Sequence, residues 1–137
     1  MVRLLCVEDD PLMRVYLTTR LDLEPDVQVV GAVSAAGEAL GFIRREMVDV
    51  ILLDYRLAGA DGLQFLGALE QDAPSQGGSH PRVLFCTGMA DATFELEARA
   101  HGAAGVVAKE QIARELIPAI RAVAGGESWF RYTGALA

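Results

Sequence analysis

The hydrophobic positions of this chain gather into short runs that alternate with longer segments of helical spacing. Each run has the length of a strand, contains many β-branched residues and shows little apolar–polar alternation. This pattern is typical of strands buried on both faces of a parallel sheet. The runs occupy residues 2–7, 27–33, 48–54, 83–87 and 105–108.

The segments that follow the runs repeat their apolar residues every three or four positions, as amphipathic helices do. We expect the repeated residues of each segment to form the buried face of one helix. In chain order these faces comprise Leu12, Val15, Tyr16, Thr19 and Leu23; Ala39, Leu40, Ile43 and Met47; Phe65, Leu66 and Leu69; Phe94 and Ala98; and Ile112, Leu116, Ile120 and Val123.

A regular alternation of strands and helices predicts an α/β domain with a parallel sheet and helices on both of its faces. The length of 137 residues suits one compact domain, and 52% hydrophobic residues are enough for a sizeable core. In such folds ligands bind beyond the carboxyl ends of the strands. A functional site is therefore expected at that edge of the sheet.

Composition excludes several classes of protein. No apolar stretch approaches the ~20 residues of a membrane span, and the chain enters a strand pattern at once, without room for a signal peptide. We therefore expect a cytoplasmic protein without a membrane partner. The net charge of −7 and the absence of a Lys/Arg block argue against direct nucleic-acid binding. Cys6 and Cys86 lie inside apolar runs and are interpreted as core thiols.

Charged and polar residues follow four of the runs, at ends that a parallel sheet would bring to one edge. Two carboxylates ~4 Å apart repel by about 4 kcal/mol at an effective dielectric constant near 20, so such a cluster indicates a bound cation. Oxygen ligands favour Mg²⁺, and a lysine would offset further negative charge, leaving room for a phosphoryl group. The residues are Glu8, Asp9 and Asp10 after the first run, Asp54 ending the third, Thr87 ending the fourth and Lys109 after the fifth.

Asp10 is the exception among these residues. It directly precedes Pro11, and an aspartate followed by proline is typical of a helix N-cap and first turn. We therefore assign Asp10 to helix capping and leave it out of the predicted site.

Four sequence motifs, each at a strand end and in this order, resemble those of two-component response regulator receiver domains. They are LLCVEDDP, ILLDYRLAGADG, VLFCTG and GVVAKE, and the resemblance covers about residues 2–125. It implies a receiver domain at 1–125, with 126–137 as a C-terminal tail or the start of a linker. It also implies a flavodoxin-like, doubly wound fold with strand order 2-1-3-4-5. That order separates Cys6 from Cys86 by two strand spacings, about 10 Å, beyond disulfide reach.

The resemblance also implies the role of each acidic residue. Asp54 would be the phospho-acceptor, and Glu8 and Asp9 would belong to the pocket that binds Mg²⁺. The backbone carbonyl of Arg56 would complete the metal site. The phosphoryl group would come from a sensor histidine kinase or a phosphotransfer protein. The chain would then catalyse only its own phosphotransfer and dephosphorylation, and would not be an enzyme in the usual sense.

Thr87 would hydrogen-bond the phosphoryl group and Lys109 would pair with it, again by resemblance. Many receivers carry Tyr or Phe three residues before this lysine as a rotating switch, but here the residue is Val106. A valine has no ring to move between buried and exposed positions. The relay from Thr87 to an aromatic ring is therefore not expected here, while the acceptor chemistry is unaffected.

The output of the chain has several interpretations. The segment GVVAKEQIARELIPAIRAVAGGESWF resembles receivers of the nitrate-response class, which normally continue into a DNA-binding helix-turn-helix domain. The chain would then regulate transcription, touching DNA only through an output domain that it does not itself contain. Alternatively, it is a stand-alone receiver that acts by protein contact, as a homodimer or in a phosphorelay.

Two further alternatives concern the acidic pocket. A Mg²⁺-dependent aspartyl-phosphate phosphatase of the haloacid dehalogenase type needs an acid two residues after its nucleophile. Arg56 occupies that position, which counts against this class. An interaction module with a vestigial pocket is the remaining alternative, and failure to bind Mg²⁺ or to accept phosphate would support it.

Overall fold

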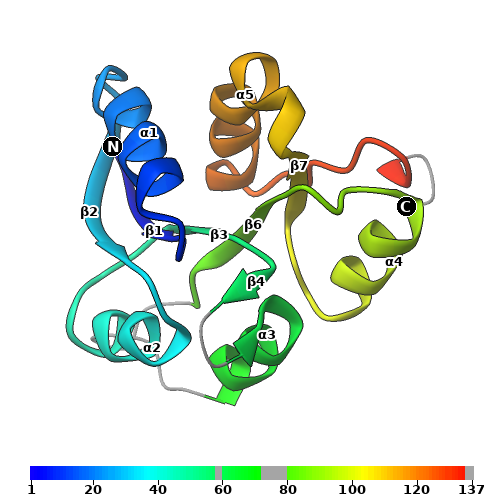
Figure 1. The fold of residues 1–137 in the computed structure, drawn as a ribbon, viewed down its shortest axis with the longest axis horizontal. Helices are drawn as coiled ribbons and strands as arrows, with labels where there is room; N and C mark the ends of the chain where they lie inside the picture. Colours follow the sequence, from blue (N-terminus) through cyan, green and yellow to red (C-terminus); the bar gives the residue numbers. More distant parts are fainter. Residues whose placement is uncertain (58–59, 72–79, 135–137) are drawn as a thin grey trace.

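The computed structural model describes residues 1–57, 60–71 and 80–134 of the chain. Strands and helices alternate along it as the hydrophobic pattern predicts (Figure 1). In chain order the elements are β1 (Val2–Val7), α1 (Pro11–Asp22), β2 (Val27–Val33), α2 (Ala36–Arg45), β3 (Val50–Leu53), β4 (Arg56–Leu57), β5 (Ala60–Asp61), α3 (Gly62–Gln71), β6 (Arg82–Thr87), α4 (Ala92–Ala100), β7 (Gly105–Ala108), the 3₁₀ turn η2 (Lys109–Gln111) and α5 (Ile112–Ala124).

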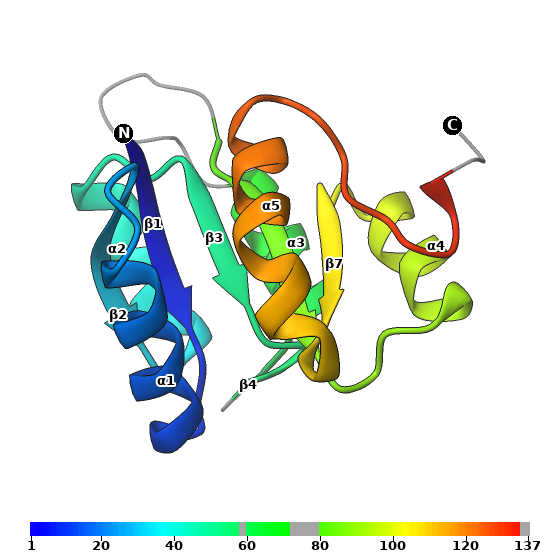
Figure 2. The same ribbon diagram turned by 90° about the horizontal axis from the view of Figure 1, so that it is seen from above.

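The main sheet has five parallel strands in the order β2-β1-β3-β6-β7. This is the predicted order 2-1-3-4-5, because β4 and β5 form a separate antiparallel pair. Helices α1 and α5 cover one face of the sheet, and α2, α3 and α4 cover the other (Figures 1 and 2). The predicted α/β class is thus confirmed. No helix among the described residues is both long and apolar enough to cross a membrane.

The central strands β1, β3 and β6 are apolar at most positions because both of their faces are covered. Successive side chains of a strand point to opposite faces, so Leu4 and Cys6 of β1 join the core beneath α1 and α5, while Leu5 and Val7 join the core beneath α2 to α4. Strand β2 is different, since it lies at the edge of the sheet and most of its residues are half-buried or exposed. The expectation of burial on both faces is wrong for this strand.

Helix α1 buries a different face from the one that its spacing predicts. Leu17 and Leu21 are buried against the sheet, whereas Leu12, Val15 and Leu23 are 83%, 62% and 72% exposed. Apolar residues occur around most of this helix, so spacing alone does not distinguish the face that packs. The predicted faces of α3, α4 and α5 are buried as expected; in α2, Ala39 and Ile43 are buried, while Met47 is exposed and lies beyond the helix end.

Strand register brings the carboxyl ends of the parallel strands to one edge of the sheet. Val7 of β1 pairs with Leu53 of β3, and Thr87 of β6 pairs with Ala108 of β7. The residues that follow these ends therefore share one side of the molecule, as the sequence predicts.

The chain after α5 folds back onto the domain. Gly126 adopts a φ of +93°, a left-handed conformation that glycine tolerates best. The following residues run beside β7 towards α4 (Figures 1 and 2) and form a parallel bridge between Trp129 and Gly105. The tail is therefore attached to the edge of the sheet at Trp129.

Candidate functional site

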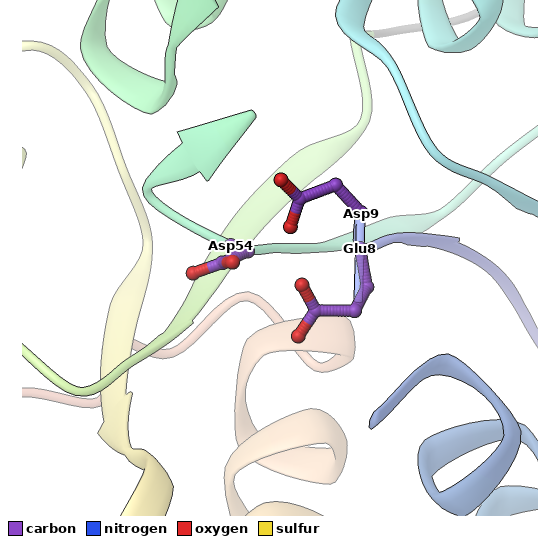
Figure 3. Close-up of side chains that lie close together, drawn as sticks. All are labelled: Glu8, Asp9 and Asp54. Carbon is purple, nitrogen blue, oxygen red and sulfur yellow. The ribbon is translucent and has the colours of Figure 1, made fainter. Parts of the chain in front are cut away.

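Three carboxylates meet beyond the ends of β1 and β3. Glu8 and Asp9 follow β1, Asp54 follows β3, and one oxygen from each lies within 4.8 Å of the others. Figure 3 shows these side chains next to one another. Glu8 is buried, Asp54 is half-buried and Asp9 is exposed, so the cluster opens to solvent on the side of Asp9.

Backbone hydrogen bonds fix the two loops that carry these carboxylates. The N–H of Asp54 donates to the Val7 carbonyl at 3.1 Å, and the N–H of Glu8 donates to the Val33 carbonyl at 3.0 Å. The Arg14 guanidinium donates to the Glu8 carbonyl at 2.8 Å, which ties α1 to the acidic loop. Sequence reasoning did not single out Arg14, and no local pattern marks it.

Asp10 serves the helix, as its position before Pro11 predicts. Its carboxylate accepts hydrogen bonds from the N–H groups of Leu12 and Met13 and so caps α1. The cluster is therefore made by Glu8, Asp9 and Asp54 without Asp10.

Lys109 supplies the positive charge of the site. It is the only lysine in the sequence and begins η2 directly after β7. Its ammonium nitrogen lies 3.2 Å from Glu8 Oε1 and 3.5 Å from Asp54 Oδ2. Burial lowers the pKa of Lys109, but the charges of Asp54 and Glu8 outweigh that effect and the pKa is raised. The ammonium is therefore charged at neutral pH and holds the two carboxylates together.

Glu8 has the most perturbed environment of the three acids. Burial raises the pKa of Glu8 to about 7, and the adjacent Asp54 adds to the shift while Lys109 opposes it. Glu8 Oε1 is buried and has no hydrogen-bond partner among the described residues; its contact with Lys109 is ionic. The Lys109 ammonium compensates part of the charge on this oxygen, and a further cation would compensate the remaining negative charge of the cluster.

The donor set fits a hard divalent cation. Three carboxylates from two strand ends offer oxygens close enough to share one ion. Mg²⁺ takes one or two carboxylates and keeps several waters, which the exposed side of Asp9 allows. Glu8, Asp9 and Asp54 are thus the residues that could hold Mg²⁺.

The backbone carbonyl of Arg56 is not used in the pairing of β4 with β5. In an antiparallel pair, hydrogen-bonded and non-hydrogen-bonded positions alternate. Arg56 pairs with Asp61, while the neighbouring Tyr55 carbonyl accepts a hydrogen bond from Gly62. Arg56 therefore occupies a non-hydrogen-bonded position, and its carbonyl faces away from β5.

Thr87 ends β6 at the same edge of the sheet and is buried. Its hydroxyl oxygen accepts a hydrogen bond from the N–H of Met89 at 3.1 Å. The hydroxyl hydrogen remains available, because a threonine side chain can accept and donate at once. Thr87 is thus able to donate to an anion bound at this edge.

Comparison with known proteins agrees with the resemblance to receiver domains. The family model described as the response regulator receiver domain matches residues 4–121. The chain is 32% identical over 126 residues to the probable transcriptional regulatory protein NarL of Mycobacterium tuberculosis, covering 91% of this chain and 56% of that protein. It is 33% identical over 129 residues to the nitrate/nitrite response regulator protein NarP of Escherichia coli, covering 93% and 57%. The chain thus spans a little over half the length of these relatives.

Solved structures are also similar. A two-component response regulator of the LuxR family from Aurantimonas sp. SI85-9A1 superposes with a TM-score of 0.86 at 28% identity, covering 99% of this chain and 94% of the other. The signal receiver domain of the putative response regulator NarL from Mycobacterium tuberculosis gives a TM-score of 0.81 at 32% identity, covering 92% and 98%. With the fold, the acidic cluster and the lysine in place, the chain belongs to the response regulator receiver domain family.

Proposed function

We propose that this chain accepts a phosphoryl group on Asp54 in a Mg²⁺-dependent reaction. The donor would be a sensor histidine kinase or a phosphotransfer protein. The observation that carries the proposal is the junction of Asp54 with Glu8, Asp9 and Lys109 at one sheet edge. We place this function in the cytoplasm, where response regulators typically act.

The chemistry follows from the position of each group. An oxygen of the Asp54 carboxylate attacks phosphorus, the bond from phosphorus to the donor nitrogen breaks, and an acyl phosphate forms. Mg²⁺ would be held by Glu8, Asp9, Asp54 and the Arg56 carbonyl, and it would supply charge neutralisation when bound. Lys109 pairs with a phosphoryl oxygen, and Thr87 donates its hydroxyl hydrogen to another. Catalysis is mostly positioning and charge stabilisation.

We infer that the chain acts as a switch and catalyses no further reaction beyond its own phosphotransfer and dephosphorylation. Arg56 stands where a haloacid dehalogenase-type phosphatase has its second acid, and its exposed side chain lies on the short strand β4. An arginine keeps its protons at neutral pH and so cannot protonate a leaving group as a general acid would. A phosphatase role is therefore not favoured.

The relatives support a proposal for the partners. NarL and NarP are named as regulators, and this chain matches a little over half of each. We propose that residues 1–125 are the receiver unit, that 126–137 begin the connection to an output, and that the output regulates transcription. DNA would be contacted only by such an output domain. A stand-alone receiver that works through protein contacts, in a homodimer or a phosphorelay, is the second form of the same function.

The experiment is an intact mass measurement after incubation with Mg²⁺ and acetyl phosphate. Wild type should gain one phosphoryl group, and Asp54→Asn should gain none. Asp10→Asn is the matched control, because Asp10 is an acid at the same edge whose capping role asparagine preserves; it should gain the group as wild type does. Absence of a gain in wild type, under conditions that preserve acyl phosphate, would refute the proposal and favour a vestigial pocket.

A further inference from the structure

A buried carboxylate on α4 is bound entirely by the tail. Glu95, in the first turn of α4, is 1% exposed. Its Oε2 accepts a hydrogen bond from the N–H of Arg131 at 3.0 Å. Its Oε1 accepts the N–H groups of Tyr132 and Thr133 and the hydroxyl of Thr133, each at 2.9 Å. A buried charge must be matched by hydrogen bonds, and here the tail backbone provides them.

The tail has a second attachment on β7. The N–H of Trp129 donates to the Ala104 carbonyl and the N–H of Val106 donates to the Trp129 carbonyl, both at 2.9 Å. This is strand addition to a sheet edge. Gly105 makes the approach feasible, because a methyl group there would lie 2.8 Å from the Trp129 carbonyl oxygen.

Side chains of α4 and α5 make further contacts with the tail. Arg131 pairs with Glu115 of α5 at 2.8 Å, and the Trp129 indole donates to the same carboxylate at 3.1 Å. On α4, the Arg99 guanidinium lies 4.6 Å from the centre of the Phe130 ring and donates to the Thr133 carbonyl at 3.2 Å. The tail thus bridges α4, β7 and α5.

Both attachments lie beside parts of the chain that lead to the site. The loop from Thr87 leads through Met89 to Asp91, which caps α4 and accepts the N–H of Phe94 at 2.7 Å. Glu95 directly follows Phe94 in this first turn of α4. On the other side of the tail, its backbone partner Val106 belongs to the strand that delivers Lys109 to Glu8 and Asp54.

We propose that residues 127–133 form a strap that is docked on α4 and β7 in the resting protein and is released by phosphorylation of Asp54. The coupling rests on the proposed function. When Thr87 donates to the phosphoryl group, the loop it shares with Met89 changes, and the first turn of α4 moves with it. The Glu95 carboxylate then loses its fit to three consecutive backbone N–H groups. The strap then acts as the switching element, because Val106 has no aromatic ring that could rotate.

The first arm of the test concerns docking alone, in the unphosphorylated protein. Hydrogen exchange should show protected amides at Val106, Trp129 and Arg131 to Thr133. Glu95→Gln replaces one acceptor by an NH₂ group facing the Arg131 N–H, so these amides should exchange at least roughly tenfold faster. Thr133→Val, a second and milder variant, should shift them in the same direction. Glu97→Gln, an exposed glutamate on the same helix, is the control and should leave exchange unchanged.

Two results of this arm would overturn the strap: unprotected tail amides in wild type, or wild-type exchange in both Glu95→Gln and Thr133→Val. Circular dichroism checks that each variant is folded. Trp129, the only tryptophan, gives an independent signal, since its emission should shift to the red on release.

The second arm adds Mg²⁺ and acetyl phosphate, with the phosphorylated fraction read from the intact mass. The strap amides of phosphorylated wild type should exchange faster by about tenfold or more, while those of Asp54→Asn stay protected. Full phosphorylation with an unchanged strap would overturn the release and leave the proposed function intact. No phosphorylation at all would overturn the proposed function and the release together, while docking stands or falls on the first arm.

Discussion

The ammonium nitrogen of Lys109 lies 3.2 Å from Oε1 of Glu8, a buried oxygen without a hydrogen bond among the described residues. The two residues come from opposite ends of the sequence and meet because β1, β3, β6 and β7 end at one edge. We expect charge compensation at this pair to affect both the stability of the domain and its affinity for a cation.

The first prediction concerns pH. The pKa of Glu8 in the folded protein, about 7, is above its ordinary value because the side chain is buried. Glu8 therefore makes its full contribution to stability when the pH is below its ordinary pKa. This contribution is lost as the pH rises through 7. Between pH 5.5 and 8, without divalent cations, the free energy of unfolding should fall by ~2 kcal/mol on account of this group. Urea unfolding at both pH values measures it.

Glu8→Gln isolates the effect of that carboxyl. The variant should lose the ~2 kcal/mol difference between the two pH values, while Glu110→Gln, an exposed acid of the neighbouring turn, should keep it. An unchanged pH difference in Glu8→Gln would show that Glu8 titrates at its ordinary pKa.

The second prediction concerns cation affinity. Lys109 and Mg²⁺ are attracted by the same carboxylates and repel each other. Lys109→Met should therefore bind Mg²⁺ several-fold more tightly, as expected for ~1 kcal/mol of repulsion near a protein surface. Phosphorylation by acetyl phosphate should nevertheless be slower, because the lysine no longer pairs with the transferred group.

Calorimetric titration with Mg²⁺ provides the measurement, and Arg114→Met provides the control, since it removes an exposed positive charge from α5. Weaker Mg²⁺ binding in Lys109→Met than in Arg114→Met would contradict the model of two competing cations.

The third prediction compares two glycines of α3. A methyl group at Gly62 would overlap the Phe85 ring and lie 3.2 Å from Tyr55 Cα, whereas one at Gly67 would meet no atom within 4 Å. Gly62→Ala should lower the free energy of unfolding by ~1–3 kcal/mol. Gly67→Ala should raise it by ~0.5–1 kcal/mol, because alanine loses less backbone entropy in a helix. Urea denaturation of both variants tests the pair, and equal effects would contradict the packing at Gly62.

The fourth prediction concerns the two cysteines. Burial raises the pKa of both Cys6 and Cys86 to about 12, and both are free thiols. Because the thiolate is the reactive form, neither should react with Ellman's reagent at pH 8 in the native state, and both should react in denaturant. Rapid labelling of the native protein would show that the central strands open readily.

Much of this molecule follows from local sequence. The apolar runs of β1, β3 and β6 predict strands covered on both faces, and the acids and lysine that end such strands predict a shared site. These features depend on short-range patterns. A strand that is apolar at consecutive positions must be covered on both faces to keep its side chains out of water. The cap at Asp10 is also predicted locally, because an aspartate directly before a proline is typical of the start of a helix.

Only the tertiary structure decided which side of α1 is buried and where the tail lies. Helix α1 carries apolar residues on several sides, so packing against the sheet, and not spacing, selects Leu17 and Leu21. Glu95 stands between apolar neighbours on α4, and no local pattern marks it as buried. Its partners are Arg131 to Thr133, 36 to 38 residues away. A charge is stable in such a position only because a distant segment brings its backbone donors to it, and that depends on the folded chain as a whole.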